Sequence, residues 1–324
     1  MQLGIGLPSF SSPSHTVPAD RFRRYARLAD EADFAGAWLI EHLGENPNYA
    51  TSLLDPLTTL SVVAGETETL PVGTSVLLLP LRNPVMVAKR AASLQHLSSR
   101  RVTLGLGMGY VDAEFDAVGV PLAERSERYL EGIELIQRLF AEDRVTYEGE
   151  HFSVEDFRLE PVLGQPPRLL AGGGGVDTDE GRRVARGVKR RMLYADGWIA
   201  PPRSLEVLET DWAAFASYLE SQDRDPDRYE KVLLQYLHLV PGEEPSQVRR
   251  EQRAVYRGIL GENRTIDDAM QGWLTGTVDE VRATLADYER LGFDEVILHP
   301  VSTDPGDLDR QLRLYRDVLQ PDYR

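Results

Sequence analysis

Eight short apolar runs recur along the 324 residues of this chain, and most of them are continuous rather than alternating. Continuous apolar runs are typical of strands that are buried on both faces, as in a parallel sheet. Segments with the periodicity of amphipathic helices lie between them. The expected strands are Leu3–Leu7, Ala37–Ile40, Val72–Leu79, Val102–Leu106, Arg168–Ala171, Gly197–Ala200, Val232–Val240 and Glu295–Leu298. Eight such alternations favour a closed (β/α)₈ TIM barrel over an open sheet, and we expect a single domain over residues 1–324.

Several helix boundaries can be predicted from local sequence. Asp55-Pro56 and Asn83-Pro84 each place a capping side chain before a proline that suits the first helical position. Thr277 followed by Glu280 forms a capping box, and Gly292 is suited to end that helix. The expected apolar stripes are Phe22, Tyr25, Ala26 and Ala29 in one helix, and Leu130, Ile133, Ile136 and Phe140 in another.

Three connections are longer than ordinary loops between strands and helices, namely Gly107–Leu122, Ala141–Pro167 and Gly258–Gly276. Long connections in a compact domain usually carry function, and those that follow strand carboxyl ends build the active site of a barrel. We expect substrate selection to depend on Val111–Leu122, Arg186–Tyr194 and Gly258–Gly276.

The charge of the chain narrows the possible partners. A formal net charge of −16 argues against nucleic acid or an anionic membrane as the main partner. Only three of the 36 basic residues are lysines, at Lys89, Lys189 and Lys231. This acidic, lysine-poor composition suits a salt-adapted cytoplasm, and a GC-rich genome explains the arginines equally well.

The chain contains no cysteine, which excludes disulfides, cysteine nucleophiles and thiolate metal sites. No apolar run approaches the roughly 18 residues that a membrane-spanning helix needs. The amino terminus opens directly into the strand-like run Leu3–Leu7, without the basic and apolar regions of a signal peptide. We therefore expect a cytoplasmic protein.

Glu41 and His42 directly follow the second expected strand, at the position of the barrel mouth. A histidine beside a carboxylate can move protons near neutral pH. Adjacent residues of a strand point to opposite faces, however, so the two side chains need not touch. A loop histidine next to a surface glutamate is the alternative interpretation.

The run Gly105-Leu106-Gly107-Met108-Gly109-Tyr110 leaves the fourth expected strand. It resembles a dinucleotide-binding fingerprint but lacks the third glycine, because Tyr110 stands at that position. The remaining glycines would let a flat ligand approach the backbone closely. Tight packing between strand and helix is an equally good explanation.

The run Ala171-Gly172-Gly173-Gly174-Gly175 follows the fifth expected strand, and a helical pattern starts near Asp177. A glycine-rich turn before a helix offers free N–H groups and the positive end of a helix dipole, which suits phosphate. Asp177, Asp179 and Glu180 count against an anion site unless they point away from the ligand, and Arg182 and Arg183 could offset them. A structural loop is the alternative.

The remaining candidate motifs are weak. His96, His151, His238 and His299 form no metal-ligand spacing, and we expect structural roles for them, although His299 follows the last expected strand and could reach the barrel mouth. No G-x-S-x-G nucleophile motif is present. Trp198 is more typical of a core or pocket wall than of a cofactor site.

Taken in order, these segments resemble the luciferase-like monooxygenase family, which includes FMN-dependent monooxygenases and oxidoreductases dependent on coenzyme F420. The resemblance covers nearly the whole chain and depends on the order of the pieces rather than on any single motif. The pieces are Leu3–Leu7, Ala37–His42, Val72–Val76, Pro80–Pro84, Leu97–Val102, Gly105–Tyr110 with Glu114-Phe115, Arg128–Phe140, Ala171–Gly175, Ala195–Trp198 and Gly276–Val281.

The resemblance implies a (β/α)₈ barrel that holds a flavin-type ring in its mouth. In relatives that use F420, a non-proline cis peptide of the third strand backs the ring, and the matching bond here joins Ser75 and Val76. Gly107, Gly109 and Tyr110 would line the ring pocket. The run Ala171–Gly175, and in particular its four glycines, would hold the cofactor phosphate. Glu41 and His42 match a pair at the second strand, and His42 is the expected acid/base or cofactor-stabilising residue.

The sequence departs from the family in two respects. F420-dependent sugar-phosphate dehydrogenases of the family carry an acidic residue at the position of Tyr110, and they use lysines to bind the substrate phosphate. Tyr110 and the scarcity of lysine therefore argue against a sugar-phosphate substrate. Histidines that monooxygenases of the family use in later loops have no assignable match here.

Two cofactors remain open at this point. Reduced FMN would react with oxygen, whereas F420 would exchange a hydride with an organic substrate while His42 handles the proton. The acidic composition and the Ser75–Val76 match favour F420 slightly. No nicotinamide fingerprint is visible, so an FMN enzyme would receive reduced flavin from a partner flavin reductase.

We expect a small organic substrate and a homodimer or larger assembly. A non-catalytic flavin-binding barrel is one alternative, which the Glu41-His42 pair disfavours. A metal-dependent barrel hydrolase is another, disfavoured because no metal-ligand cluster is visible.

Overall fold

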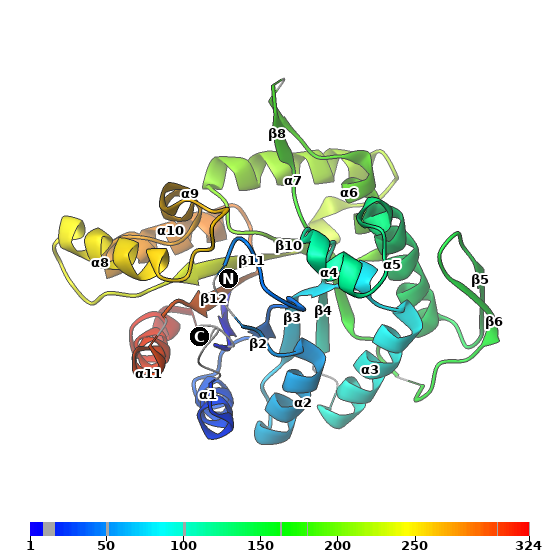
Figure 1. Ribbon diagram of the computed structural model, residues 1–324, viewed down its shortest axis with the longest axis horizontal. Coiled ribbons are helices and arrows are strands. Elements are labelled where there is room, and N and C mark those ends of the chain that lie inside the picture. The colour runs from blue at the N-terminus through cyan, green and yellow to red at the C-terminus, as the bar shows by residue number, and fades with distance from the viewer. Residues whose placement is uncertain are drawn as a thin grey trace.

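The structure, a computed structural model, describes residues 1–8, 17–49, 52–99, 102–162, 164–179, 181–302 and 304–323. Eight parallel strands close into a barrel in the order β1-β12-β11-β10-β7-β4-β3-β2, with helices around it (Figure 1). The strands are β1 (Gln2–Gly6), β2 (Ala37–Leu39), β3 (Val72–Leu78), β4 (Val102–Gly107), β7 (Arg168–Gly172), β10 (Gly197–Ala200), β11 (Glu230–Leu237) and β12 (Glu295–Pro300). All eight predicted strands are confirmed, with ends that differ by at most a few residues. Arg100, Arg101 and Glu180, which entered the sequence argument, lie outside the described residues.

The first and last strands of the barrel close it. β1 pairs in parallel with β12, with Leu3 opposite Val296 and Ile5 opposite Leu298. On its other side β1 pairs with β2, where Ile5 lies opposite Ala37. The strand residues are almost all buried, which explains why the runs are continuously apolar.

The helix boundaries predicted at Asp55-Pro56, Asn83-Pro84 and Thr277 to Gly292 are confirmed. The helices are α1 (Ala19–Glu31), α2 (Pro56–Glu66), α3 (Pro84–Leu97), α4 (Asp112–Ala117), α5 (Arg125–Ala141), α6 (Arg186–Arg190), α7 (Leu205–Glu220), α8 (Pro245–Arg257), α9 (Ile266–Gly272), α10 (Val278–Arg290) and α11 (Pro305–Leu314). Asp55 and Asn83 cap α2 and α3. Thr277 and Glu280 form the predicted capping box of α10, and Gly292 beyond its end has a φ of 77°. No helix among the described residues is long and apolar enough to cross a membrane.

The two predicted apolar stripes differ in outcome. In α1 the buried residues are the four expected ones, Phe22, Tyr25, Ala26 and Ala29. In α5, Ile133 and Ile136 are buried, whereas Leu130 and Phe140 are only partly buried. The buried face of α5 is rotated because it also includes Tyr129, Gly132, Leu135 and Leu139.

The helix expected near Asp177 does not form. Instead β8 (Val176–Thr178) and β9 (Gly181–Arg183) make an antiparallel hairpin, which stands out beside α7 in Figure 1, and α6 begins only after it. The Thr178 hydroxyl donates to the Gly181 carbonyl at 2.6 Å, and Gly181 has a φ of 108°. This glycine permits the tight turn, so Asp177 lies on a hairpin strand and not on the first turn of a helix.

The three long connections lie in different places. Gly107–Leu122 follows β4 and contains α4. Gly258–Gly276 contains α9 and reaches the strand ends through a bridge between Leu237 and Leu274. Ala141–Pro167 instead joins a helix to a strand and contains the small hairpin of β5 (Val145–Glu148) and β6 (Ser153–Phe157). It therefore does not follow the carboxyl end of a barrel strand.

Side-chain amides hold the segment that follows β11. The Leu239 N–H donates to Oε1 of Gln311 at 2.7 Å, and Nε2 of Gln311 donates to the Leu239 carbonyl at 3.1 Å. Nε2 of Gln252 donates to the His238 carbonyl at 3.0 Å. Gln311 lies on α11 and Gln252 on α8, so two helices satisfy backbone groups that no neighbouring strand reaches.

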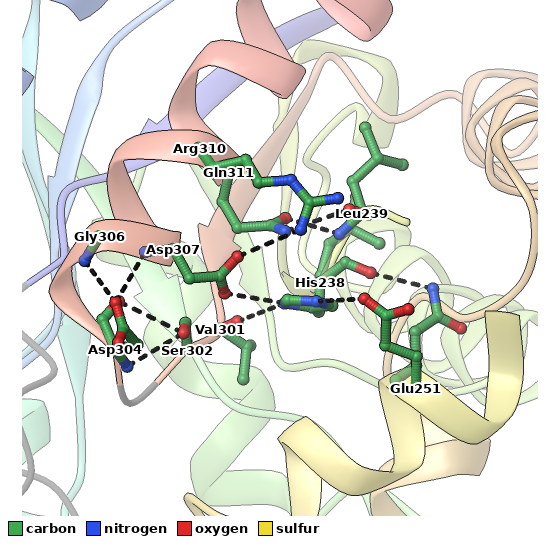
Figure 2. Close-up of polar contacts among 12 residues, drawn as sticks. His238, Leu239, Glu251, Val301, Ser302, Asp304, Gly306, Asp307, Arg310 and Gln311 are labelled. Atoms are coloured by element: carbon green, nitrogen blue, oxygen red, sulfur yellow. Dashed lines mark hydrogen bonds and ion pairs between the residues drawn. The ribbon is translucent and has the colours of Figure 1, made fainter. Parts of the chain in front are cut away.

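His238 sits at the centre of the same junction. Its Nδ1 donates to the Val301 carbonyl at 2.9 Å, and the carboxylates of Asp307 and Glu251 lie 3.6 and 3.7 Å from its two ring nitrogens. Figure 2 shows the imidazole between these two carboxylates, which come from α11 and α8. The sequence-based expectation of a structural histidine agrees with these contacts.

Candidate active site at the barrel mouth

The predicted site residues lie on neighbouring strands at or near their carboxyl ends. Glu41 and His42 follow β2, Ser75 and Val76 lie in β3, and Gly107 ends β4. The glycine run begins at the end of β7, which pairs with β4. Because these strands are consecutive in the barrel, the predicted residues share one side of its mouth.

His42 is held by three polar neighbours. Its Nδ1 lies 3.1 and 3.2 Å from the two carboxylate oxygens of Glu114, which also accepts from the Leu43 N–H at 2.5 Å. Its Nε2 lies 2.6 Å from the amide nitrogen of Asn46, which donates to the Tyr110 hydroxyl at 2.9 Å. An ionised Glu114 only accepts, so this pattern assigns the imidazole proton to Nδ1 and leaves Nε2 as the acceptor.

Glu41 points away from His42. Its carboxylate accepts from the Leu78 N–H at 2.6 Å and pairs with Arg82, which also binds Asp55 at 2.8 Å. Burial raises the pKa of Glu41 above its ordinary value, and the Arg82 guanidinium opposes that shift. With 2% of its surface exposed, Glu41 ties the end of β2 to β3 and α2.

The peptide bond between Ser75 and Val76 is cis, as the resemblance implied. Ser75 is buried, and its hydroxyl lies 3.2 Å from Nε2 of His299 in β12. Val76 is the partly exposed residue of an otherwise buried strand. Burial lowers the pKa of His299 to about 3, so its imidazole is neutral near pH 7.

Two glycines at and just beyond the end of β4 leave space for neighbouring side chains. A Cβ at Gly107 would collide with the Val76 side chain. Gly109 has a φ of 74°, and a Cβ there would lie 3.0 Å from the Phe115 ring. Tyr110 is 47% exposed and packs edge-on against His42, with ring centroids 5.6 Å apart. Gly107 and Val76 therefore form one wall of the mouth, next to the His42 network.

The glycine run divides into two halves with different surroundings. A Cβ at Gly172 would collide with the Leu106 carbonyl, so this glycine permits close contact between β7 and β4. Gly173 is partly exposed, has a φ of 119° and would accept a Cβ with only ordinary contacts. The space beside Gly173 is therefore open.

The second half of the run already holds an anion of the protein itself. The buried carboxylate of Asp211, on α7, accepts from the Gly175 N–H at 2.9 Å and pairs with Arg182 at 2.7 Å. A Cβ at Gly174 or Gly175 would collide with this carboxylate. Arg182 also pairs with Asp177 at 3.0 Å. Arg182, which the sequence suggested could offset the acidic residues at an anion site, is therefore already paired with carboxylates of the protein.

Arg191 lies next to the open half of the run. Its Nη1 lies 3.9 Å from the position that a Gly173 Cβ would take, and its side chain is buried. The sequence pointed to its segment, Arg186–Tyr194, as one that selects the substrate, but did not distinguish Arg191 from the neighbouring arginines, which are typical of a surface.

A depression of about 640 Å³ lies beside these glycines. Asn48, Gly175, Arg203 and Arg264 are among the residues that line it. The Arg264 guanidinium binds the Tyr49 hydroxyl and lies over the Tyr49 ring, 5.2 Å from its centre.

No metal centre is found in the part of the chain that the structure describes: it contains no group of three or more His, Asp or Glu side chains placed to hold an ion.

Comparison with known proteins agrees with this arrangement. A family model described as luciferase-like monooxygenase matches residues 1–295. The chain belongs to the luciferase-like monooxygenase family. The resemblance inferred from the ordered segments is thereby confirmed.

Two relatives within the family illustrate the range of similarity. An F420-dependent hydroxymycolic acid dehydrogenase of Mycobacterium tuberculosis is 32% identical over 213 residues, which cover 64% of this chain and 56% of that protein. The chain thus spans little more than half the length of that relative. An F420-dependent glucose-6-phosphate dehydrogenase of Kineococcus radiotolerans is 28% identical over 306 residues, 86% of this chain and 87% of that protein.

Two solved structures of oxidoreductases share the fold. An F420-dependent secondary alcohol dehydrogenase in complex with an F420–acetone adduct matches with a TM-score of 0.79 at 17% identity, over 100% of both chains. The oxygenating constituent of 3,6-diketocamphane monooxygenase from Pseudomonas putida, in complex with FMN, matches with a TM-score of 0.73 at 15% identity, over 100% of this chain and 99% of that one. The sequence relatives therefore include F420-dependent dehydrogenases, and an FMN-binding monooxygenase shares the fold.

Three residues of the site were not assigned roles from the sequence. Glu114 was noted only as part of the family resemblance, although it lies in a long connection after β4 where function was expected. Asn46 carried no signal of its own. His299 was expected to be structural, with a place at the barrel mouth as the alternative, and the structure brings it within 3.2 Å of the Ser75 hydroxyl.

Proposed function

We propose that this chain is an oxidoreductase that uses coenzyme F420 or FMN to act on a small organic substrate at the barrel mouth. The observation that carries the proposal is the His42–Glu114 pair, which lies on the side of the mouth where Val76 and Gly107 form a wall. A buried carboxylate that orients a histidine is an arrangement suited to proton transfer.

The residues at the mouth fit a phosphorylated ring cofactor. Gly173 leaves a partly exposed space that a Cβ would fill, and the buried Arg191 borders that space. Val76 offers an apolar side chain for a flat ring, and the Tyr110 ring packs edge-on against His42. Ser75, Val76, Gly107, Gly109 and Tyr110 would contact the ring. Ala171 and Gly172–Gly175 remain the predicted phosphate segment, with Gly173 as its open position.

His42, Glu114 and Glu41 would have different roles in the reaction. A reduced flavin or deazaflavin bound here supplies a hydride or reacts with oxygen. His42 would take up or deliver the accompanying proton at Nε2, and Glu114 would orient the imidazole through Nδ1. Glu41, predicted as catalytic, would position His42 by fixing the end of β2 through Arg82.

The proposal extends to a reductase partner, the domain organisation, the assembly state and the location of the protein. With FMN, a partner flavin reductase would supply the reduced cofactor. The proposal also includes one domain over residues 1–324, a homodimer or larger assembly and a cytoplasmic location. Light scattering of the purified protein tests the assembly state.

A non-catalytic flavin-binding barrel is the second candidate. It would need the ring wall but not an oriented histidine. The Glu114 carboxylate, buried and aimed at His42, favours the enzyme.

A titration of the purified protein with F420 and with FMN tests the proposal, followed by ring absorbance and fluorescence. Preference for F420 supports hydride transfer and leads to a screen of ketones, alcohols and enoates. Preference for FMN, and especially for reduced FMN, supports a monooxygenase. Binding without turnover of the reduced cofactor by any acceptor supports the non-catalytic candidate. Binding of neither ring refutes the proposal.

A further inference from the structure

We infer that Arg191 supplies the charge of a buried phosphate site beside Gly173, and so makes this chain selective for ring cofactors that carry a phosphate ester. The identity of the ring rests on the proposed function. The anion site itself rests on contacts that do not depend on that function.

The guanidinium of Arg191 is buried without an acidic partner. Its side chain is 2% exposed, and its Nε makes no hydrogen bond. Its Nη2 contacts the Met108 sulfur at 2.8 Å, and the group lies over the Tyr129 ring, 4.2 Å from the centre. No carboxylate of the described residues lies within ion-pair distance of it. A thioether and an aromatic face compensate a buried charge only weakly, so the free protein holds a cation that lacks its counterion.

Nearby charges add to the positive potential instead of neutralising it. Burial, together with the nearby Arg125, lowers the pKa of Arg191. Arg125 is the first residue of α5, whose 17 residues direct the positive end of a helix dipole to this side. Ser126, next along α5, lies 3.2 Å from the position of a Gly187 Cβ, so the start of α5 borders the segment that carries Arg191.

Only one part of the glycine run is available to an external anion. Asp211 occupies the neighbourhood of Gly174 and Gly175. Beside Gly173, a Cβ would meet only Nη1 of Arg191 and the Val188 side chain, both at 3.9 Å. An anion entering from the mouth therefore meets Arg191 at Gly173. The planar guanidinium suits a phosphate, which can accept two of its N–H groups at once.

Arg191→Met tests this role because it removes the charge and keeps an unbranched apolar side chain. Arg190→Met is the matched control, since it removes the same charge from an exposed position one residue away. Binding is measured with two pairs of ligands: FMN with riboflavin, and F420 with its deazaflavin ring compound that lacks the phosphate. We expect Arg191→Met to weaken the phosphorylated member about 10- to 100-fold and to leave the other unchanged. Arg190→Met should change neither.

Inorganic phosphate provides a readout that needs no ring cofactor. Phosphate should raise the melting temperature of the parent and of Arg190→Met above that in chloride of equal ionic strength, and it should not do so for Arg191→Met. Without phosphate, Arg191→Met should be at least as stable as the parent, because an uncompensated buried charge is removed. Arg191→Lys should keep part of the phosphate response.

A purely structural role predicts the opposite pattern. Arg191→Met would then lower the melting temperature and leave the phosphate response and the FMN-to-riboflavin affinity ratio as in the parent, which would overturn the inference. If Arg191→Met does not fold, the parent protein alone can test the inference. Equal affinity of the parent for FMN and riboflavin, with no competition between phosphate and FMN, would also overturn the inference. An Arg191-dependent phosphate response without binding of any ring refutes the proposed function and leaves the anion site standing.

Discussion

The two histidines of the barrel mouth have opposite environments. His42 contacts a carboxylate and an amide and is only partly buried. His299 is buried in β12, and its pKa of about 3 keeps it neutral throughout the physiological range. His42 is therefore the residue suited to proton transfer, whereas His299 serves as a hydrogen-bond partner of Ser75.

His42→Ala is expected to lower turnover by about 100- to 10 000-fold, which is the usual contribution of a general acid or base. Cofactor affinity should change little, because the ring wall and the Arg191 site remain. Steady-state kinetics and a separate binding titration measure the two effects. His96→Ala is the control, since His96 is exposed on α3. Turnover equal to that of the parent would remove His42 from the mechanism.

Glu295 lies at the other end of β12 and predicts a pH-dependent stability. It is buried and accepts from the Trp38 indole at 2.7 Å, and burial raises its pKa from 4.5 to about 7. Because the folded-state pKa is raised, the folded protein binds the proton more tightly. The contribution of Glu295 to stability is then complete below pH 4.5 and is lost as the pH rises through 7.

Glu295→Gln keeps the acceptor for Trp38 and removes the titration. Relative to the parent, the variant should gain up to about 3 kcal/mol between pH 4.5 and 7, with no further gain above that range. Urea unfolding of both proteins at pH 5, 6, 7 and 8 measures the difference. A difference that does not vary with pH would contradict the prediction.

Among the elements, the segment after β11 depends on side chains for its backbone hydrogen bonds. Gln311 of α11 satisfies both the N–H and the carbonyl of Leu239, and all three groups are buried. The contact joins α11 to the strand end and mimics the pairing that another strand would provide. Loss of this contact should leave the N–H and the carbonyl of Leu239 without hydrogen-bond partners.

Gln311→Leu is expected to lower the free energy of unfolding by about 2–4 kcal/mol, because both groups of Leu239 lose their partner in a buried place. Urea denaturation measures the change. In the control Gln222→Leu, an exposed amide that bonds only its neighbour Ser221 is removed, and stability should hardly change. Equal effects of the two substitutions would show that the Gln311 contacts are dispensable.

The strands and caps were predictable because they depend on local pattern. The apolar run at Gly197–Ala200 predicts a buried strand, and Thr277 with Glu280 predicts a helix start, each from a few neighbouring residues. The hairpin after Gly175 was not predictable in the same way, since Gly181 and the pairing of Arg182 with the distant Asp211 outweigh the helical pattern.

The same distinction applies to the site. The position of His42 after a strand indicated function, whereas its partner Glu114 lies 72 residues away and becomes adjacent only when β2 and β4 enter one barrel. Arg191 was still harder to predict, because the lack of a carboxylate partner depends on how the side chain is buried in the fold and not on its sequence neighbours.

For the whole molecule, the seam between β1 and β12 determines whether the barrel is closed. Gly4 faces Ile297 across this seam. A Cβ at Gly4 would collide with the Glu295 carboxylate and lie 2.7 Å from Nε1 of Trp38. Both side chains are buried, so neither can move away easily.

Gly4→Ala is expected to destabilise the whole barrel by about 1–3 kcal/mol, the usual cost of overpacking a core. Because the seam joins the two ends of the chain, tryptophan fluorescence and far-ultraviolet circular dichroism should show one coincident transition. Gly65→Ala is the control: nothing lies within 4 Å of its Cβ, and it should be neutral or slightly stabilising within α2. An unaltered midpoint for Gly4→Ala would refute the prediction.

The Asp211 carboxylate on the glycine run has a consequence for the size of cofactor that the proposed site could admit. A pyrophosphate, as in FAD or a nicotinamide dinucleotide, would need a second anionic position next to the first. Here that position is already occupied by the Asp211 carboxylate, which pairs with Arg182. The turn would therefore accept a cofactor with one phosphate group, such as a mononucleotide or a single phosphodiester. It would exclude a dinucleotide, whatever its base or sugar, because the second phosphate would meet the Asp211 carboxylate.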